Sequence, residues 1–263
     1  MPNRALLTAA TGMQVQQQNV DNIANNLANA STVGFKRTRL EFQDLLYQNM
    51  RTAGGAANAS TALPVGLQIG LGARSIASER VFIQGESKQT ENPLDMVIEG
   101  SGFFQIRQTN GDLSYSRSGQ FHLNNQGQIV TAQGDSLEPA ITIPTEATSI
   151  SIGKDGTVSV SLPGQTNASN VGQIQLAIFA NPAGLEALGG NLYKETGASG
   201  AATVGTPDSN GIGAISDGFV EGSNVNVVEE LVNMISAQRM YETNSKVITT
   251  ADRMLGTINQ AVS

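Results

Sequence analysis

The stretch that decides the fold is residues 227–262, which read VVEELVNMISAQRMYETNSKVITTADRMLGTINQAV. Apolar side chains recur in it every seven residues, at Val227, Met234, Tyr241, Ile248, Leu255 and Val262. An interval of seven returns a side chain to nearly the same face of a helix, as in a coiled-coil seam. Met240, Val247, Met254 and Ala261 each precede one of these residues and are expected to widen the stripe. The segment therefore predicts one helix, roughly 54 Å long at about 1.5 Å per residue.

A capping pattern marks the start of this helix. Asn226 can accept hydrogen bonds from the first free N–H groups, and Glu229 stands three residues further on. Glu230 adds a second negative charge in the first turn, where the helix dipole favours it. The helix is expected to begin at about Val227.

A second helix is predicted from about Asn3 to Ala30, because this segment has neither proline nor a β alternation. Its apolar residues also repeat every seven positions, at Leu6, Met13, Val20 and Leu27. Gly12 weakens this helix locally by about 1 kcal/mol relative to alanine. Gly34 is expected to turn the chain at the helix end, with Phe35 packing just beyond the turn.

Polar residues interrupt the second half of this N-terminal helix, at Asn22, Asn25, Asn26 and Asn29. One interpretation is a water-exposed face that lines a channel. The other is hydrogen bonding between subunits that fixes their register, as a buried asparagine does in a coiled coil. The residues themselves leave both interpretations open.

The two apolar stripes also allow two interpretations. The helices can pack on each other as a private core, or the terminal pair can associate with the same pair from other subunits. Their position at both ends of the chain, around a β-like middle, favours the second. The residues expected at the subunit interface are Leu6, Met13, Val20, Asn25, Asn26, Leu27, Val227, Leu231, Met234, Ile235, Tyr241, Ile248 and Leu255.

The middle of the chain is predicted to be antiparallel β structure. Residues 149–162 alternate on both sides of a Lys154-Asp155-Gly156 turn, which is a hairpin pattern. Ile174, Leu176 and Ile178 alternate in a further strand. Other strands are expected at residues 97–106, 113–117, 120–123 and 129–131. The short spacing favours a sandwich or barrel over alternating strands and helices.

The predicted fold class is α+β, with long N- and C-terminal helices forming a coiled-coil-like inner core and a β-rich antiparallel middle domain. We expect an axial helix at residues 1–34, an extension or linker at 35–66, a β-rich outer domain at 67–224 and a second axial helix at 225–263. Residues 51–63 read RTAGGAANASTAL, which is too small and polar to form a core. A flexible loop is expected there, and a loop of this length is often functional.

Composition excludes several classes of protein. The net charge is −7, whereas a nucleic-acid binder normally carries a basic footprint. The basic cluster of Lys36, Arg37 and Arg39 is therefore expected to be a solvated helix edge or a subunit contact. There is no cysteine, hence no disulfide or thiolate site. No run approaches the roughly 18 apolar residues of a membrane span, and the N-terminus does not read as a cleaved secretion signal.

No catalytic constellation stands out. His122 is the only histidine, and its alternating strand predicts a solvated side chain rather than a catalytic base. Glu91 with Asp95 could be proposed as a carboxylate pair, but nothing supports it. We expect no enzymatic activity, no cofactor and no metal.

Two long segments resemble a known family. Residues 22–36, NIANNLANASTVGFK, resemble the N-terminal signature of flagellar rod, hook and hook-associated proteins. Residues 223–235, SNVNVVEELVNMI, with Gln238-Arg239 and residues 241–244, resemble their C-terminal signature. Residues 42–48, 63–70, 102–106, 138–144 and 181–186 resemble the distal rod members in particular. The resemblance covers essentially the whole chain.

This resemblance implies a structural subunit of the bacterial flagellar rod in the periplasm, assembled as a homo-oligomeric helical tube that transmits torque. It implies terminal helices on the inside, β structure outside, a stiffening role for about residues 47–66, and export through the flagellar type III apparatus. Implied partners are proximal rod, hook and hook-junction proteins and the surrounding outer-membrane and peptidoglycan rings. A proximal rod or hook subunit is the alternative within the family. A secreted β-rich adhesin or binding module is the alternative from another class.

Overall fold

A computed structural model describes residues 2–51, 56–58, 61–62, 65–164 and 167–262. The chain forms two compact units. The first takes residues up to 28, residues 38–79, and residues from 226 onward; the second takes residues 29–37 and 80–225. The finer four-part division expected from the sequence stays a prediction.

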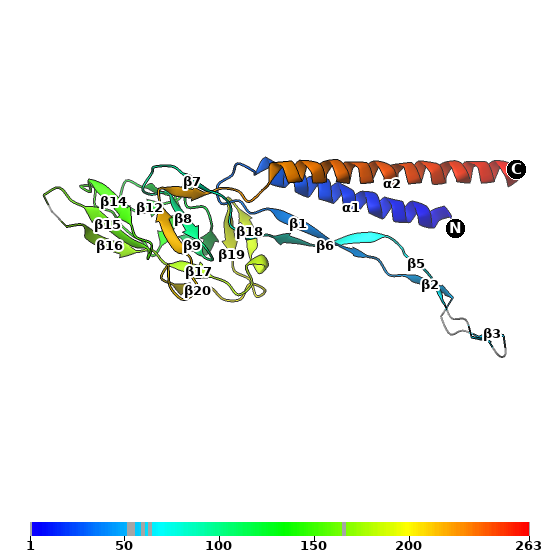
Figure 1. Cartoon of the computed structure of the whole chain (residues 1–263), viewed down its shortest axis with the longest axis horizontal. Coiled ribbons are helices and arrows are strands. Elements are labelled where there is room, and N and C mark those ends of the chain that lie inside the picture. The colour runs from blue at the N-terminus through cyan, green and yellow to red at the C-terminus, as the bar shows by residue number, and fades with distance from the viewer. Residues whose placement is uncertain (1, 52–55, 59–60, 63–64, 165–166, 263) are drawn as a thin grey trace. The chain divides into compact units, whose positions relative to one another are not determined.

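Two long helices dominate the first unit. Helix α1 spans Pro2–Ala28 and helix α2 spans Val227–Val262, and they pack on each other (Figure 1). The predicted cap is confirmed, because the Asn226 Oδ1 accepts hydrogen bonds from the N–H groups of Val228 and Glu229 at 3.1 and 3.3 Å. The predicted α+β class, with helices from both chain ends packed together, is therefore confirmed.

A two-stranded ribbon completes the first unit. Strand β1 (Thr38–Asp44) pairs with β6 (Ala73–Arg80), and β2 (Gln48–Arg51) pairs with β5 (Leu67–Ile69). Further along, β3 (Ala56–Asn58) pairs with β4 (Thr61–Ala62). The flexible loop predicted at residues 51–63 is therefore wrong at Arg51, which ends β2, and where β3 and β4 form; residues 52–55, 59–60 and 63 lie outside the described residues.

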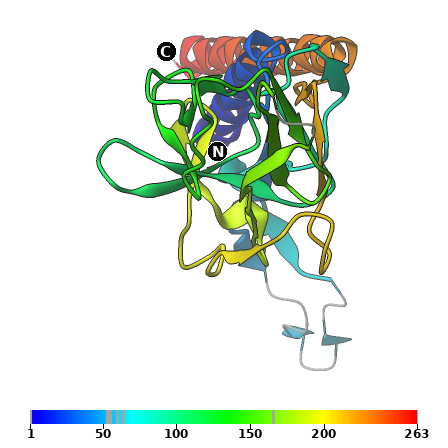
Figure 2. The same ribbon diagram turned by 90° about the vertical axis from the view of Figure 1, so that its left-hand side faces the viewer.

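The second unit holds the remaining strands and one short 3₁₀ helix. They are β7 (Ser87–Gln89), β8 (Met96–Glu99), β9 (Phe103–Arg107), β10 (Leu113–Ser116), β11 (His122–Leu123), β12 (Ile129–Val130), β13 (Ser136–Glu138), β14 (Ser149–Ile152), β15 (Thr157–Ser161), β16 (Ser169–Gln173), β17 (Leu176–Ile178), η1 (Pro182–Gly184), β18 (Glu186–Gly189), β19 (Leu192–Lys194), β20 (Thr203–Gly205), β21 (Ala214–Asp217) and β22 (Phe219–Glu221). The largest sheet follows the order β11-β12-β13-β9-β10-β19-β18, with β17 also on β9 and β20 on β17. Figure 2 shows these strands wrapping around a common interior.

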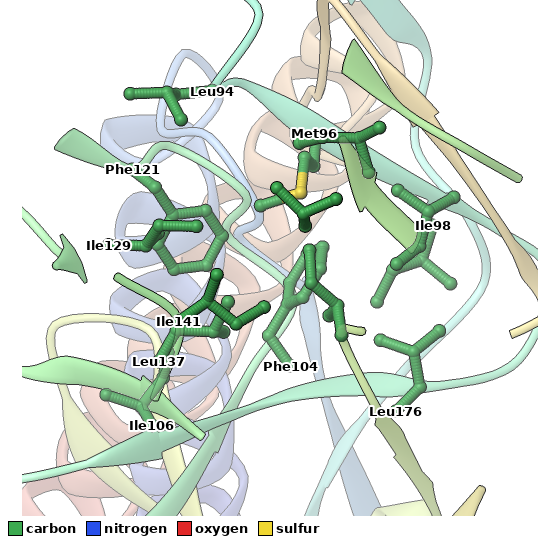
Figure 3. Packing of buried hydrophobic residues seen from close by; sticks show 14 of the residues in the cluster. Leu94, Met96, Ile98, Phe104, Ile106, Phe121, Ile129, Leu137, Ile141 and Leu176 are labelled. Atoms are coloured by element: carbon green, nitrogen blue, oxygen red, sulfur yellow. The ribbon is translucent and has the colours of Figure 1, made fainter. Parts of the chain in front are cut away.

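Strand β9 lies between two apolar clusters because successive side chains of a strand point to opposite faces. Phe104 and Ile106 enter the larger cluster, where the rings of Phe104 and Phe121 meet edge to face at 5.2 Å (Figure 3). Phe103 points the other way and packs edge to face on Phe179, at 5.7 Å between ring centroids. The second unit thus has its own core.

Most strand predictions hold for this unit. The predicted hairpin is confirmed as β14–β15, with Ile150 opposite Val160 in an antiparallel ladder. The strands predicted at residues 113–117, 120–123 and 129–131 form β10, β11 and β12, each slightly shorter.

Two strand boundaries were wrong. The single strand predicted at residues 97–106 is divided into β8 and β9, because Gly100 and Gly102 adopt positive φ angles of 111° and 154°. β8 then pairs with β21, whereas β9 joins the large sheet. Ile174 is buried between β16 and β17 rather than within one strand with Leu176 and Ile178.

A buried ion-pair network ties together the two chain segments that flank the second unit. The Lys36 ammonium pairs with one carboxylate oxygen of Glu221 and donates to the Ile83 carbonyl at 2.7 Å. Arg117 Nε donates to the other oxygen of Glu221 at 3.0 Å. The N–H of Gly85 also donates to Glu221, at 2.9 Å. All three charged side chains are at most 4% exposed, and burial lowers the pKa of Lys36 while Glu221 opposes that shift.

This network corrects the prediction for the basic cluster. Lys36 is fully buried in an ion pair rather than on a solvated edge. Arg39 is exposed and pairs with Glu79 at 2.7 Å across the ribbon. The predicted turn is confirmed, since Gly34 has a φ of 71° and a Cβ there would lie 2.6 Å from the Ser118 nitrogen. Phe35 is buried directly after it.

Replacing Glu221 with alanine should destabilise the chain by about 3–5 kcal/mol, because it leaves two buried cations without their partner. Urea unfolding of the full-length chain measures this cost. The matched control is Glu138→Ala, which removes a surface carboxylate paired with Arg107 at 2.8 Å and should cost about 1 kcal/mol or less. Equal losses from both variants would contradict the importance of the buried network.

Candidate assembly surface on the terminal helices

One face of α1 packs against α2 through a coiled-coil spacing. On α2, the buried and half-buried residues include Met234, Ala237, Asn244, Ile248, Ala251 and Leu255, which lie three, four or seven positions apart. Ala237 is only 2% exposed. A Cβ on Gly12 of α1 would lie 2.8 Å from the Asn244 side-chain nitrogen. The small residues at these positions let the two helices approach closely.

A second face of α1 holds the ribbon. Asn22 and Asn26, one helical turn apart, both donate their side-chain N–H to the carbonyl of Thr38 at 2.9 Å. The Thr38 N–H donates back to Asn26 Oδ1 at 2.9 Å. About one helical turn before Asn22 on the same face, Gln18 Oε1 accepts a hydrogen bond from the Ser75 hydroxyl at 2.7 Å. The strands β1 and β6 thus lie along α1, as Figure 1 shows.

A third face of α1 remains open and is largely polar. It carries Ala10, Gln14, Gln17, Asp21 and Ala24, all exposed. Gln17 donates to the Asp21 carboxylate at 3.0 Å along the helix surface. This face has the chemistry of a surface that meets water.

Helix α2 leaves a large apolar surface uncovered by α1. The first part, called here the outer face of α2, consists of Val227, Val228, Leu231, Val232 and Ile235, which are between 42% and 71% exposed. Beside it an open groove with a volume of about 620 Å³ runs along the helix pair. The groove is lined by Gln16, Val232, Ile235, Ser236, Arg239, Met240, Thr243 and Asn244. Contiguous apolar surface of this kind typically marks a site of protein association.

The structure divides the predicted interface residues into two groups. On α1, Leu6, Met13, Val20 and Leu27 are half-buried, as are Met234, Ile248 and Leu255 on α2. Val227, Leu231, Ile235 and Tyr241 are exposed. Asn25 is exposed, whereas Asn26 is 1% exposed and bonded within the chain. Their contact with neighbouring subunits stays a prediction.

The expected widening of the α2 stripe stays a prediction. Met240, Val247 and Met254 are 52%, 43% and 60% exposed and lie beside the seam rather than in it. The seam instead uses Ala237 and Asn244, which sequence reasoning missed because alanine and asparagine carry little apolar signal. Val228 and Val232 were also missed, although their spacing with Ile235 repeats the helical period.

Outside the helices, nothing among the described residues forms a catalytic or metal centre. His122 is exposed on β11, as predicted from its strand. The described residues contain no group of three or more metal-ligating side chains. Within the same residues, neither helix is long and apolar enough to cross a membrane.

Comparison with known proteins shows the family of the chain. Three family profiles match the chain in order: "Flagella basal body rod protein" at residues 6–36, "Flagellar hook protein FlgE/F/G D1 domain" at 97–160, and "Flagellar basal body rod FlgEFG protein C-terminal" at 216–261. The first and third matches cover most of α1 and α2. The second lies within the β-rich unit.

Full-length relatives carry the same description. The chain is 50% identical to "Flagellar basal-body rod protein FlgG" of Caulobacter vibrioides over 98% of each chain. It is 49% identical to the protein of that name from Buchnera aphidicola subsp. Acyrthosiphon pisum and 48% identical to that from subsp. Schizaphis graminum, over 97% of this chain and 98% of each relative.

The chain belongs to the FlgG family of flagellar basal-body rod proteins. It is a structural component of the flagellar basal-body rod and serves motility rather than catalysis. Membership in this family means assembly with other rod and hook proteins. In this family, the paired helices and their uncovered apolar surface are the features to explain.

Replacing Gly12 with leucine should weaken the pairing of α1 and α2, because the larger side chain would have to displace Asn244. Overpacking of this kind costs about 1–3 kcal/mol. Thermal unfolding of the full-length chain, followed by the helical circular dichroism signal, measures the loss. The control Ala10→Leu introduces the same side chain on the open face of α1 and should leave the transition nearly unchanged; matching shifts would contradict the close approach at Gly12.

Proposed function

We propose that this chain is a subunit of the distal part of the flagellar rod and that copies of it polymerise into a helical tube. The tube transmits torque from the motor to the hook. The observation that carries this proposal is the outer face of α2, an apolar surface that the chain's own α1 does not cover.

The energetics favour burial of this surface in an assembly. Fully burying a valine, leucine or isoleucine side chain contributes about 1.5–3 kcal/mol. The outer face of α2 offers five such residues, all at least 42% exposed. A second copy, packed against this face and the adjoining groove, would remove them from water and continue the helix packing beyond one chain.

The open face of α1 supports a place for it inside the tube. Gln14, Gln17 and Asp21 are exposed and polar, as the lining of a water-filled channel requires. We assign α1 and α2 to the inner layer of the tube and the β-rich unit to its outer layer. The outer layer would then meet the surrounding outer-membrane and peptidoglycan rings.

The same proposal accounts for delivery and neighbours. Export through the flagellar type III apparatus would bring the chain to the growing end of the rod. There it would join proximal rod subunits on one side and the hook or its junction proteins on the other. Continuous apolar contacts along the helices would let each interface between neighbouring subunits resist torsion.

Replacing Leu231 or Ile235 with aspartate should abolish polymerisation while the β-rich unit stays folded. A charge buried in an apolar contact without a partner costs several kcal/mol, whereas neither residue contributes to the β core. Swimming, together with electron microscopy of purified basal bodies, shows whether rods form. Near-ultraviolet circular dichroism follows the tyrosine environments of the β-rich unit.

The matched control is Asn233→Asp, an exposed position in the same turns of α2. It introduces the same charge without removing an apolar side chain, so rods should still form. Normal swimming by the Leu231→Asp and Ile235→Asp strains would refute the assignment of this face to the subunit interface.

A further inference from the structure

Thr38 is the first residue of β1, and two side chains of α1 form hydrogen bonds with it. Asn22 and Asn26 both donate to its carbonyl, and its N–H and hydroxyl donate back to them. Asn26 is 1% exposed, so its hydrogen bonds form out of water. We call this arrangement the Thr38 clasp.

The geometry of the clasp depends on the helix. Asn22 and Asn26 are four residues apart in sequence, and such residues are neighbours on one side only when the backbone between them is α-helical. In an extended chain they could not both reach one peptide carbonyl. Engagement of Thr38 therefore reports that the C-terminal half of α1 is helical.

The rest of the ribbon follows the same face of α1. Gln18 accepts from Ser75 of β6 at 2.7 Å, and a Cβ on Gly72 would lie 2.1 Å from the Thr11 hydroxyl. Thr11 and Gln18 are seven residues apart, so they lie on one face of α1. The ribbon is thus held at several points along the helix.

The held ribbon carries exposed apolar side chains. Leu46 and Tyr47, which follow β1, are 86% and 55% exposed. Leu67 lies on β5, which pairs with β2, and is 52% exposed. A two-stranded ribbon alone in water is marginally stable at best. Contacts with α1 are what can fix the direction in which these side chains are presented.

We propose that Asn22 and Asn26 are positioning residues that couple helix formation in α1 to docking of the ribbon strands β1 and β6. When α1 is helical the two amides capture Thr38 and align the ribbon along the polar face. Because coupling is reciprocal, a docked ribbon also stabilises the helix. The clasp itself is independent of polymerisation; its role in aiming Leu46, Tyr47 and Leu67 at neighbouring subunits rests on the proposed function.

The test measures ribbon docking by cross-linking. The natural chain has no cysteine, so Gln18→Cys with Ser75→Cys creates a single thiol pair where the two side chains now meet. Purified full-length chain is treated with a short bismaleimide, and the rate of the intramolecular cross-link is recorded. In this background the double substitution Asn22→Ala, Asn26→Ala should slow cross-linking about tenfold or more, since several hydrogen bonds of about 1 kcal/mol each are lost.

The substitutions separate positioning from helix stability. Alanine is a better helix former than asparagine, so the helical circular dichroism signal should be retained while docking is lost. Thr38→Val removes only the hydroxyl and should give an intermediate rate. The control Gln14→Ala, Gln17→Ala alters the open face of the same helix and should cross-link at the unsubstituted rate.

Two results would overturn the proposal. The first is an unchanged cross-linking rate in the Asn22→Ala, Asn26→Ala chain. The second is an equal slowing in the Gln14→Ala, Gln17→Ala control, which would show that the cross-linking rate does not depend on the contacts at Thr38. A chain that cross-links as expected but never polymerises would leave the clasp standing and refute the proposed function.

Discussion

The arrangement of this chain depends on a buried carboxylate, that of Glu221. It pairs with Lys36, which lies 185 residues earlier in the sequence. Lys36 lies shortly after α1 ends and Glu221 shortly before α2 begins, so the pair closes the intervening chain into a loop. Arg117 adds a second cation and donates to the carbonyls of Gly100 and Gly102 at 2.9 and 2.7 Å. Removing charges from water is costly unless they are paired, and here the two cations share the Glu221 carboxylate and also donate to backbone carbonyls. The chain segments that follow α1 and precede α2 are therefore fixed within the β-rich unit.

Helix α1 has three faces with different surroundings. Gly12 meets α2 at Asn244, Thr11 and Gln18 meet the ribbon, and another face stays open. In this single chain, α1 buries some of its sides against other elements and leaves another side exposed to solvent. The residue types differ between these faces. The face toward α2 has small and apolar residues, the face toward the ribbon has amides and hydroxyls, and the face toward water has charged or amide groups.

Much of this could be read from the sequence where the signal is periodic. The interval of seven located both helices, and α2 begins where its cap predicted, because Asn226 and the heptad act locally. The alternation around Lys154-Asp155-Gly156 located a hairpin for the same reason. The family signatures at the two ends agreed with the full-length relatives.

The missed features are long-range and polar. Nothing near Glu221 or Lys36 in the sequence indicates that they pair, since their partners come from distant segments. Asn26 was assigned to a channel or to a neighbouring subunit, because periodicity identifies a face but not what covers it. The outer face of α2 was only partly found, since Val228 and Val232 lie outside the seven-residue register. Patterns of apolar residues thus predict elements, whereas the pairing of polar groups requires the folded chain.

The polar contacts made within the chain differ in chemistry from the surface that α2 leaves uncovered. The contacts that the chain completes by itself, at Thr38 and around Glu221, consist of directional hydrogen bonds and ion pairs at buried positions. The surface that it leaves incomplete, on α2, is aliphatic. Hydrogen bonds require fixed geometry and are costly when left unmade in a dry site, so they suit contacts formed once with known partners. Apolar burial is non-directional and leaves no unsatisfied group before association, so it suits a surface that meets its partner later. A subunit can therefore complete its polar contacts within one copy, beside its own apolar core, while a further aliphatic surface stays available for assembly.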